Sequence, residues 1–129
     1  MAITITATWT EDQSVTMSDA SPADGVTSTG DIDLDTNGYD AVLVQIRITW
    51  HASATDYADI NFYMSADSGS NDDTVAYYNR RVDADAGNTT RLSQLVRDVP
   101  YAQVAVTNQS NQEIASLVVD YAGRTWQSD

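Results

Sequence analysis

Apolar and polar residues alternate along most of this chain. In residues 41–50, AVLVQIRITW, the apolar side chains at even positions fall on one face, and the residues between them are mostly polar. This period of two is typical of a β-strand that buries one face. The alternation recurs in further segments, namely residues 2–9, 13–18, 60–64, 74–82, 101–108 and 113–122. Clusters of Asp, Gly, Ser and Asn separate the segments. The sequence therefore predicts one all-β domain over residues 1–129, an antiparallel β-sandwich or a jelly-roll-like fold.

One segment also has a helical pattern. Residues 90–99, TRLSQLVRDV, place apolar side chains at spacings of three and four. Such spacings are typical of one face of a helix. Thr90 is a suitable N-cap, and Pro100 would end the helix just before it. The alternative is a crossover loop that carries Leu92 and Leu95 over the end of the sandwich. We therefore expect at most one short helix, near residues 90–99.

The charge balance bears on the kind of organism from which the chain comes. Its formal net charge is −13, and its 19 acidic residues are all aspartate except Glu11 and Glu113. Lysine is absent, and the six basic residues are all arginine: Arg47, Arg80, Arg81, Arg91, Arg97 and Arg124. This composition resembles that of proteins from extreme halophiles. At molar salt the Debye length falls to about 3 Å, so the repulsion between carboxylates is screened while they keep the surface hydrated. The alternative is a mesophilic acidic protein that has few lysines by chance.

Composition also excludes several classes of function. The chain has no cysteine and a single histidine, His51, so we expect neither a thiol nucleophile nor a multi-histidine metal site within one subunit. It has no run of about eighteen apolar residues, and its N-terminus does not have the pattern of a signal peptide, so no membrane span or leader is expected. Direct contact with nucleic acid is not expected, because the acidic surface would repel phosphate. Ser53 and Asp56 lie near His51 in the sequence, but this proximity does not make a catalytic triad, so we expect no enzyme activity.

The stretch DIDLDTNGYD is rich in aspartate. Asp31, Asp33 and Asp35 match the first three ligand positions of a calcium loop of the EF-hand type. Such a loop also needs glycine at its sixth position and a carboxylate at its twelfth, where this chain has Thr36 and Val42. The motif fails at both positions. What remains is a weakly held structural cation at the three aspartates, and no other cofactor is expected.

The same stretch has a second interpretation as a β-hairpin. Ile32 and Leu34 alternate with the aspartates, which is typical of a strand with its apolar face inward. Asn37-Gly38 is a strong signal for a type I′ turn, because that turn requires positive φ at both central residues. We favour this interpretation, in which the chain turns there and continues as the strand of residues 39–50.

Two parts of the chain have the residue types of protein interfaces. Arg80-Arg81 is the only adjacent basic pair and closely follows Tyr77-Tyr78. Tyrosine and arginine are enriched at interface hot spots, so these arginines form either an ion pair within the chain or a contact between subunits. The termini are the second part. Residues 2–9 form a natural edge strand, and Trp126 either caps the core or docks on a neighbour. The predicted interface residues are Ile3, Ile5, Tyr77, Tyr78, Arg80, Arg81, Arg124 and Trp126.

The end of the sequence resembles a group of viral proteins. The stretch DVPYAQVAVTNQSNQEIASLVVDYAGRTWQSD is similar to the final hairpin of small β-sandwich virion proteins of tailed viruses, including capsid decoration (cement) proteins. The shared features are the VPYAQVAVTN strand, a polar Asn/Ser/Gln turn, a second alternating strand and a short aromatic-basic terminus. The resemblance covers about a quarter of the chain.

The resemblance implies a structural role with no catalytic residues. Such proteins sit on the outer surface of the particle, often as trimers, and clamp neighbouring capsid subunits. Combined with the halophile-like composition, the resemblance implies a virion protein of a tailed virus that infects a salt-loving archaeon, assembled in the host cytoplasm. The expected partners are the major capsid protein or another virion protein, together with further copies of the chain.

The alternative function is a carbohydrate- or receptor-binding module of the tail-fibre or turret type. Trp9, Trp50, Trp126 and the pair Tyr77-Tyr78 are the aromatic residues that would stack on sugar rings. Trp9 and Trp50 lie on the apolar faces of their predicted strands, so we expect both in the core. That expectation weighs against this alternative.

Overall fold

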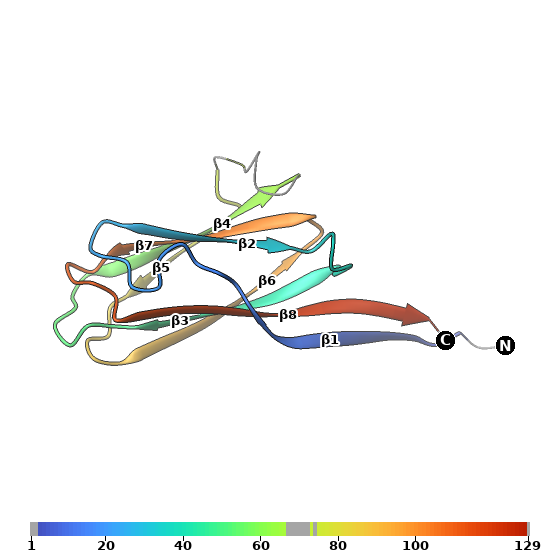
Figure 1. The fold of residues 1–129 in the computed structure, drawn as a ribbon, viewed down its shortest axis with the longest axis horizontal. Helices are drawn as coiled ribbons and strands as arrows, with labels where there is room; N and C mark the ends of the chain where they lie inside the picture. Colours follow the sequence, from blue (N-terminus) through green and yellow to red (C-terminus); the bar gives the residue numbers. More distant parts are fainter. Residues whose placement is uncertain (1–2, 67–72, 74, 129) are drawn as a thin grey trace.

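The computed structural model describes residues 3–66, 73 and 75–128, which form two four-stranded antiparallel sheets packed face to face (Figure 1). The first sheet has the strand order β1 (Ile5–Ser14), β8 (Ser116–Ser128), β3 (Ala41–Thr49) and β6 (Thr89–Arg97). The second sheet has the order β2 (Thr27–Asp33), β7 (Tyr101–Gln109), β4 (Tyr57–Ser65) and β5 (Tyr78–Asp83). Successive strands change sheet except between β4 and β5, which is the arrangement of an eight-stranded jelly roll. The prediction of an all-β antiparallel sandwich is confirmed.

The core lies between the sheets and is built from alternate residues of the strands other than β1, none of whose residues is buried. Val44 and Ile46 of β3 and Phe62 of β4 have no exposed surface. Trp50 follows β3 and is also buried, and its indole Nε1–H donates to Thr90 Oγ1 at 2.9 Å. A buried indole needs such an acceptor. Trp50 is therefore a core residue, as predicted.

Residues 90–99 lie mostly in β6, so the predicted helix is wrong and the alternative crossover loop is wrong as well. β6 pairs with β3 in an unbroken antiparallel register. A spacing of four residues fits a strand as well as a helix, because it is two strand periods. Leu92 and Val96 accordingly face the core, whereas Leu95 is 40% exposed on the outside. The described residues contain no helix, and thus none of a length and hydrophobicity that could cross a membrane.

The predicted hairpin at Asn37-Gly38 is also wrong. β2 and β3 belong to different sheets, so residues 34–40 carry the chain across the end of the sandwich. Gly38 has a φ of 70°, but Asn37 is not among the residues with positive φ, so the turn is not type I′. Tyr39 N donates to Leu34 O at 2.9 Å, which together with the positive φ of Gly38 makes a Schellman-type turn. The burial predicted for Leu34 is confirmed.

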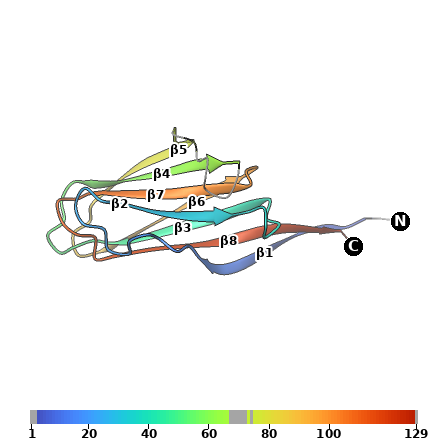
Figure 2. The same cartoon turned by 45° about the horizontal axis from the view of Figure 1, so that its top comes forward.

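β1 and β8 continue past the end of the sandwich as a two-stranded ribbon (Figure 2). β3 accompanies β8 only as far as Arg124, which lies opposite Ala41. The pairing of β1 with β8 extends further, to Ile5 opposite Ser128. Residues 5–8 of β1 and 125–128 of β8, termed the terminal ribbon, thus have no third strand beside them. Both ends of the described chain lie at its tip.

Candidate functional site at the terminal ribbon

One face of the terminal ribbon is apolar. Residues opposite each other in an antiparallel pair share a face, and Ala7 lies opposite Trp126 while Trp9 lies opposite Arg124. Ile5 follows on the same face by strand alternation, and Ile3 continues the pattern just before β1. The other face is formed largely by threonine. We term the apolar face the ribbon face. Its residues are Ile3, Ile5, Ala7, Trp9, Arg124 and Trp126.

The large side chains of the ribbon face are open to solvent. Ile3 is 71% exposed, Ile5 64%, Trp126 53% and Trp9 40%. Trp9 was predicted to be a core residue, and that prediction is wrong. Its strand has the alternation of a half-buried strand, but β1 lies at the edge of the first sheet and the face of Trp9 points away from the second sheet. Alternation identifies a face and does not tell whether anything covers it.

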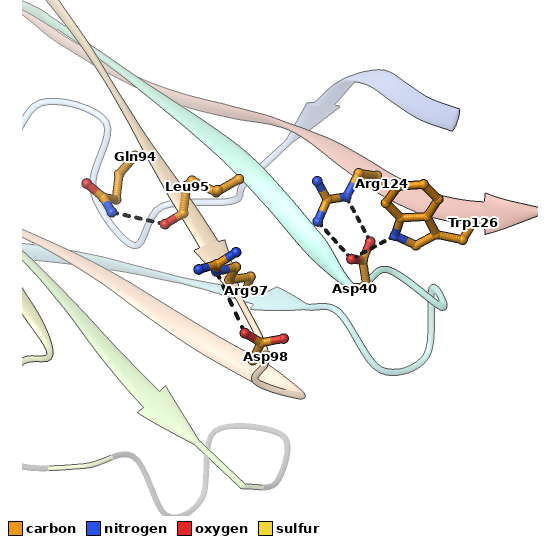
Figure 3. A network of polar contacts seen from close by, with 7 residues as sticks. All are labelled: Asp40, Gln94, Leu95, Arg97, Asp98, Arg124 and Trp126. Carbon is orange, nitrogen blue, oxygen red and sulfur yellow. Dashed lines mark hydrogen bonds and ion pairs between the residues drawn. The ribbon is translucent and has the colours of Figure 1, made fainter. Parts of the chain in front are cut away.

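An ion pair anchors the base of the ribbon (Figure 3). Arg124 donates to Asp40 through two nitrogens, Nε to Oδ1 at 3.1 Å and Nη2 to Oδ2 at 2.8 Å. The indole Nε1–H of Trp126 donates to the same Oδ2 at 3.0 Å. The guanidinium carbon of Arg124 lies 5.5 Å from the ring centroid of Trp9 and 5.3 Å from that of Trp126. Arg124 is therefore held between two indoles by cation–π contacts and by a bidentate carboxylate.

The electrostatics of this cluster favour the ionised pair. The Arg124 guanidinium, by donating to the carboxyl of Asp40, holds its pKa below the usual range, and the indole of Trp126 acts in the same direction against the opposing effect of burial. The pKa of Arg124 is raised, mainly by its hydrogen bond to Asp40. Both side chains thus stay charged through the neutral range, and the orientation of the two indoles is fixed with them.

The loop before β3 makes further contacts that hold the cluster in place. Asp40 N donates to the carbonyl of Arg124 at 3.0 Å, so the two residues are joined through backbone as well as side chains. The ring of Tyr39 lies against Gly123 of β8, where an added Cβ would come within 2.5 Å of three of its ring carbons. Tyr39 also meets Tyr121 edge to face, at a centroid distance of 6.1 Å. Only glycine at position 123 leaves room for this arrangement.

The predicted interface residues do not form one site. Ile3, Ile5, Arg124 and Trp126 come together on the ribbon face, whereas Tyr77, Tyr78, Arg80 and Arg81 lie in or next to β5 at an edge of the second sheet. Asp40 was missed, although it lies in the stretch DIDLDTNGYD. The sequence shows it as one more surface aspartate, and nothing in it relates position 40 to position 124.

One arginine of the β5 pair, Arg81, has the intrachain partner that one of the two interpretations proposed. Arg81 Nε lies 3.5 Å from Asp59 Oδ1, and its guanidinium stacks over the ring of Tyr57 at 3.6 Å. Tyr78 packs edge to face against the core residue Phe62. Arg80 is exposed on the neighbouring position of the strand. Arg81 therefore forms an ion pair within its own chain.

The aspartates considered as cation ligands do not converge. Asp31 and Asp33 lie on the outer face of β2, and Asp33 Oδ1 accepts a hydrogen bond from Thr36 N at 2.8 Å. Asp35 is in the turn that leads to Gly38. Within residues 3–66, 73 and 75–128, no three acidic or histidine side chains are grouped as metal ligands. The role shown for Asp33 is to stabilise the turn.

No protein-family model and no curated protein matches the sequence. Solved structures with some similarity include latent PorU from Porphyromonas gingivalis, at 12% identity and a TM-score of 0.46 over 100% of this chain. An exo-β-1,3-galactanase from Phanerochaete chrysosporium has 11% identity and a TM-score of 0.42 over 92% of the chain. Tailspike protein 4 of bacteriophage CBA120 has 14% identity and a TM-score of 0.34 over 97%. The chain spans 13%, 29% and 19% of these structures, respectively, and none of them bears on its function.

Proposed function

We propose that this chain is a structural virion protein, a capsid decoration protein that binds the outer shell of a tailed virus through the ribbon face. One observation carries the proposal: Ile3, Ile5 and Trp126 are more than half exposed on a ribbon that projects beyond the sandwich. A two-stranded ribbon without further support is only marginally stable in water. A shell subunit that covers it buries these side chains and stabilises the ribbon at the same time.

The composition of the ribbon face supports a protein partner. Tryptophan and arginine are the residue types most enriched at interface hot spots, and Arg124 is already held in place by Asp40. Because this guanidinium is ordered before binding, little of its own side-chain entropy is lost when a partner contacts it. In this proposal the partner is the major capsid protein or another virion protein, and the chain carries out no reaction.

The size of the ribbon face favours several copies acting together. Fully burying one aliphatic or aromatic side chain contributes about 1.5–3 kcal/mol, and the three most exposed members are about two-thirds exposed. One ribbon thus supplies about 3–6 kcal/mol before the cost of association, less than the about 8 kcal/mol of a micromolar complex. Repeated copies on a shell, or a homo-oligomer, would multiply the contact.

The rest of the molecule supports the same role. A net charge of −13 keeps the surface hydrated and repels packaged nucleic acid, which suits the outside of a particle. Double-sheet jelly rolls also occur among viral capsid domains and lectins, which is an analogy of fold alone. In this proposal the virus infects a salt-loving archaeal host, which the halophile-like composition supports.

Capsids that lack this protein test the proposal. Wild-type chain should sediment with them until the sites are filled, and it should be found on the outside of intact particles. Trp126→Ala should weaken binding about tenfold or more, which corresponds to about 1.4 kcal/mol. Leu95→Ala is the control, because it truncates an exposed apolar side chain of β6 outside the ribbon. Wild-type chain that never sediments with capsids would contradict the proposal.

A second candidate function is carbohydrate binding at the same indoles. Trp9 and Trp126 expose aromatic surface on either side of Arg124, and a hollow of about 360 Å³ next to Asp40 is lined by Asp35, Asp98 and neighbouring residues. Aromatic faces beside planar polar groups are suited to sugar rings. A glycan array distinguishes the two functions. Binding to a defined glycan that Trp126→Ala abolishes would favour this candidate, and an array with no bound glycan would remove it.

A further inference from the structure

The outer edge of β1 is open. β1 pairs with β8 along one edge, and within the described chain no other strand pairs with residues 5–10 on the opposite edge. An unpaired edge presents a row of backbone N–H and C=O groups that readily pair with another strand. The edge of β1 can therefore accept one further strand.

The other edge strands have features that block such pairing. The edge of β2 is covered by the chain segment before it, where Ser18 N donates to Thr29 O at 2.8 Å and Asp19 N donates to Ser28 Oγ at 3.0 Å. β5 is short and contains Arg80-Arg81, and β6 contains Arg91 and Arg97. Covering segments, short strands and charged residues are the usual protection of sheet edges. The first part of β1 has none of them.

β1 is uncharged where its edge is open. Residues 3–10, ITITATWT, contain no charged side chain in a chain whose net charge is −13. The first charge is Glu11, and the register with β8 shifts between Thr10 and Gln13, with Asp12 at a φ of 57°. A bulge of this kind twists a strand and ends regular pairing. The open edge is therefore limited to the uncharged segment.

This segment is complementary to itself. We propose that two copies of the chain pair antiparallel through the edge of β1, with Thr6 on the twofold axis, to form one continuous eight-stranded sheet. In this register Ile3 lies opposite Trp9 and Ile5 opposite Ala7, so apolar residues meet apolar residues on one face. Aromatic and β-branched residues are favourable cross-strand partners. A register centred on Ala7 would instead place Ile3 opposite Glu11, at the bulge.

The projection of the ribbon makes this contact possible between two acidic molecules. With Thr6 at the axis, Trp9 at the base of one ribbon lies opposite Ile3 of the other copy, so six residues separate the two bases along the strands. At about 3.4 Å per residue the two sandwiches are kept about 20 Å apart. The Debye length is about 8 Å at physiological salt and about 3 Å at 1 M, so the repulsion between the sandwiches is weakened at physiological salt and almost fully screened at 1 M. Dimerisation should therefore strengthen with salt.

This inference does not rest on the proposed function. The pairing uses the backbone edge of β1, whereas the proposed shell contact uses the ribbon face. The twofold axis is perpendicular to the sheet, so it brings the two ribbon faces to the same side. The dimer would then offer a surface twice as large to any partner, which raises its avidity.

Analytical ultracentrifugation of the full chain tests the pairing. Wild type should dimerise reversibly and more tightly at about 1 M salt than at about 0.15 M, where repulsion is screened less. Thr6→Glu should weaken dimerisation about tenfold or more at low salt, because it places two carboxylates opposite each other. Thr89→Glu adds the same charge at an exposed position of β6 and should leave the dimer intact. A wild type that stays monomeric at both salt concentrations, or a Thr6→Glu variant that dimerises like wild type, would overturn the proposal.

A cross-linking measurement fixes the register independently. The chain has no cysteine, so single-cysteine variants report one position each. Residues opposite each other in a pair have Cα atoms about 4.5–5.5 Å apart, a distance that a disulfide spans. Thr6→Cys should form a disulfide-linked dimer rapidly with diamide, and Thr10→Cys should not. Equal rates for the two variants would mean random collision and would rule out this register.

Discussion

The indole Nε1–H of Trp126 and the guanidinium of Arg124 both donate to Asp40, whose Oδ2 accepts at 3.0 Å from Trp126 and at 2.8 Å from Arg124. Asp40 belongs to the loop before β3, and its two donors belong to β8. This carboxylate therefore joins the projecting ribbon to the body of the sandwich.

Replacing Asp40 with alanine should loosen the ribbon without unfolding the protein. Asp40 is partly exposed, and exposed ion pairs add little to global stability. The local effect is larger, because Arg124 and Trp126 lose their common acceptor. We expect backbone amides of residues 124–126 to exchange about tenfold faster, while those of β3 are unchanged. Hydrogen exchange measured by mass spectrometry or NMR checks this, and equal acceleration in β3 would indicate a global effect instead.

Acidification should release the same contact. The pKa of Asp40 is lowered in the folded state because Arg124 donates to it, so the carboxylate stabilises the fold above its ordinary pKa of about 3.9. This contribution is lost as the pH falls through the lowered folded-state value. Tryptophan fluorescence should therefore change at a pH below about 3.9. The Asp40→Asn variant cannot titrate at this position and should lack that transition.

Gly123→Ala should destabilise the fold through Tyr39. The new methyl group would occupy the space of the Tyr39 ring and displace it from Tyr121. Overpacking of this kind costs about 1–3 kcal/mol, to be measured by denaturant unfolding. In a Tyr39→Ala background the same substitution should cost much less, because the space is then empty. An equal cost in both backgrounds would locate the effect in the strand backbone.

Asp120→Asn should expose a like-charge pair on the outer face of the first sheet. Arg47 lies opposite Arg91 across β3 and β6, and Asp120 of β8 binds Arg47 at 2.5 Å. Loss of that carboxylate should cost about 1 kcal/mol, since the pair is only partly exposed. Adding Arg91→Gln to the variant should recover part of the loss by removing the repulsion. A double-mutant cycle of unfolding free energies measures this coupling.

The sequence was sufficient to predict the fold class, because the alternation of apolar and polar residues is a local property of each strand. Leu92 and Val96 show its limit, since a spacing of four residues satisfies a strand and a helix alike. Asn37-Gly38 shows another limit. A turn signal says that the chain reverses direction, but the sheet that receives the next strand depends on long-range pairing. The β-sandwich or jelly-roll-like prediction left this pairing open.

The candidate site was only partly predictable for a similar reason. Ile3, Ile5, Arg124 and Trp126 were selected because apolar and aromatic residues near chain ends suit an interface. Their meeting on one face depends on the register of β1 with β8, which no local pattern specifies. Trp9 was wrongly predicted to be buried, because alternation does not show whether a second layer covers the apolar face of a strand.

The double pairing of β8 has a mechanical consequence. β8 lies between β1 and β3, and its register with β3 runs from Ser116 opposite Thr49 to Arg124 opposite Ala41. A pull on the C-terminal end of β8 acts along the strand, so it loads the backbone hydrogen bonds to β3 and to β1 in shear, all at once. Peeling would break them one after another at a much smaller force. β8, which forms half of the projecting ribbon, is thus also held by a neighbouring strand on each side within the sheet.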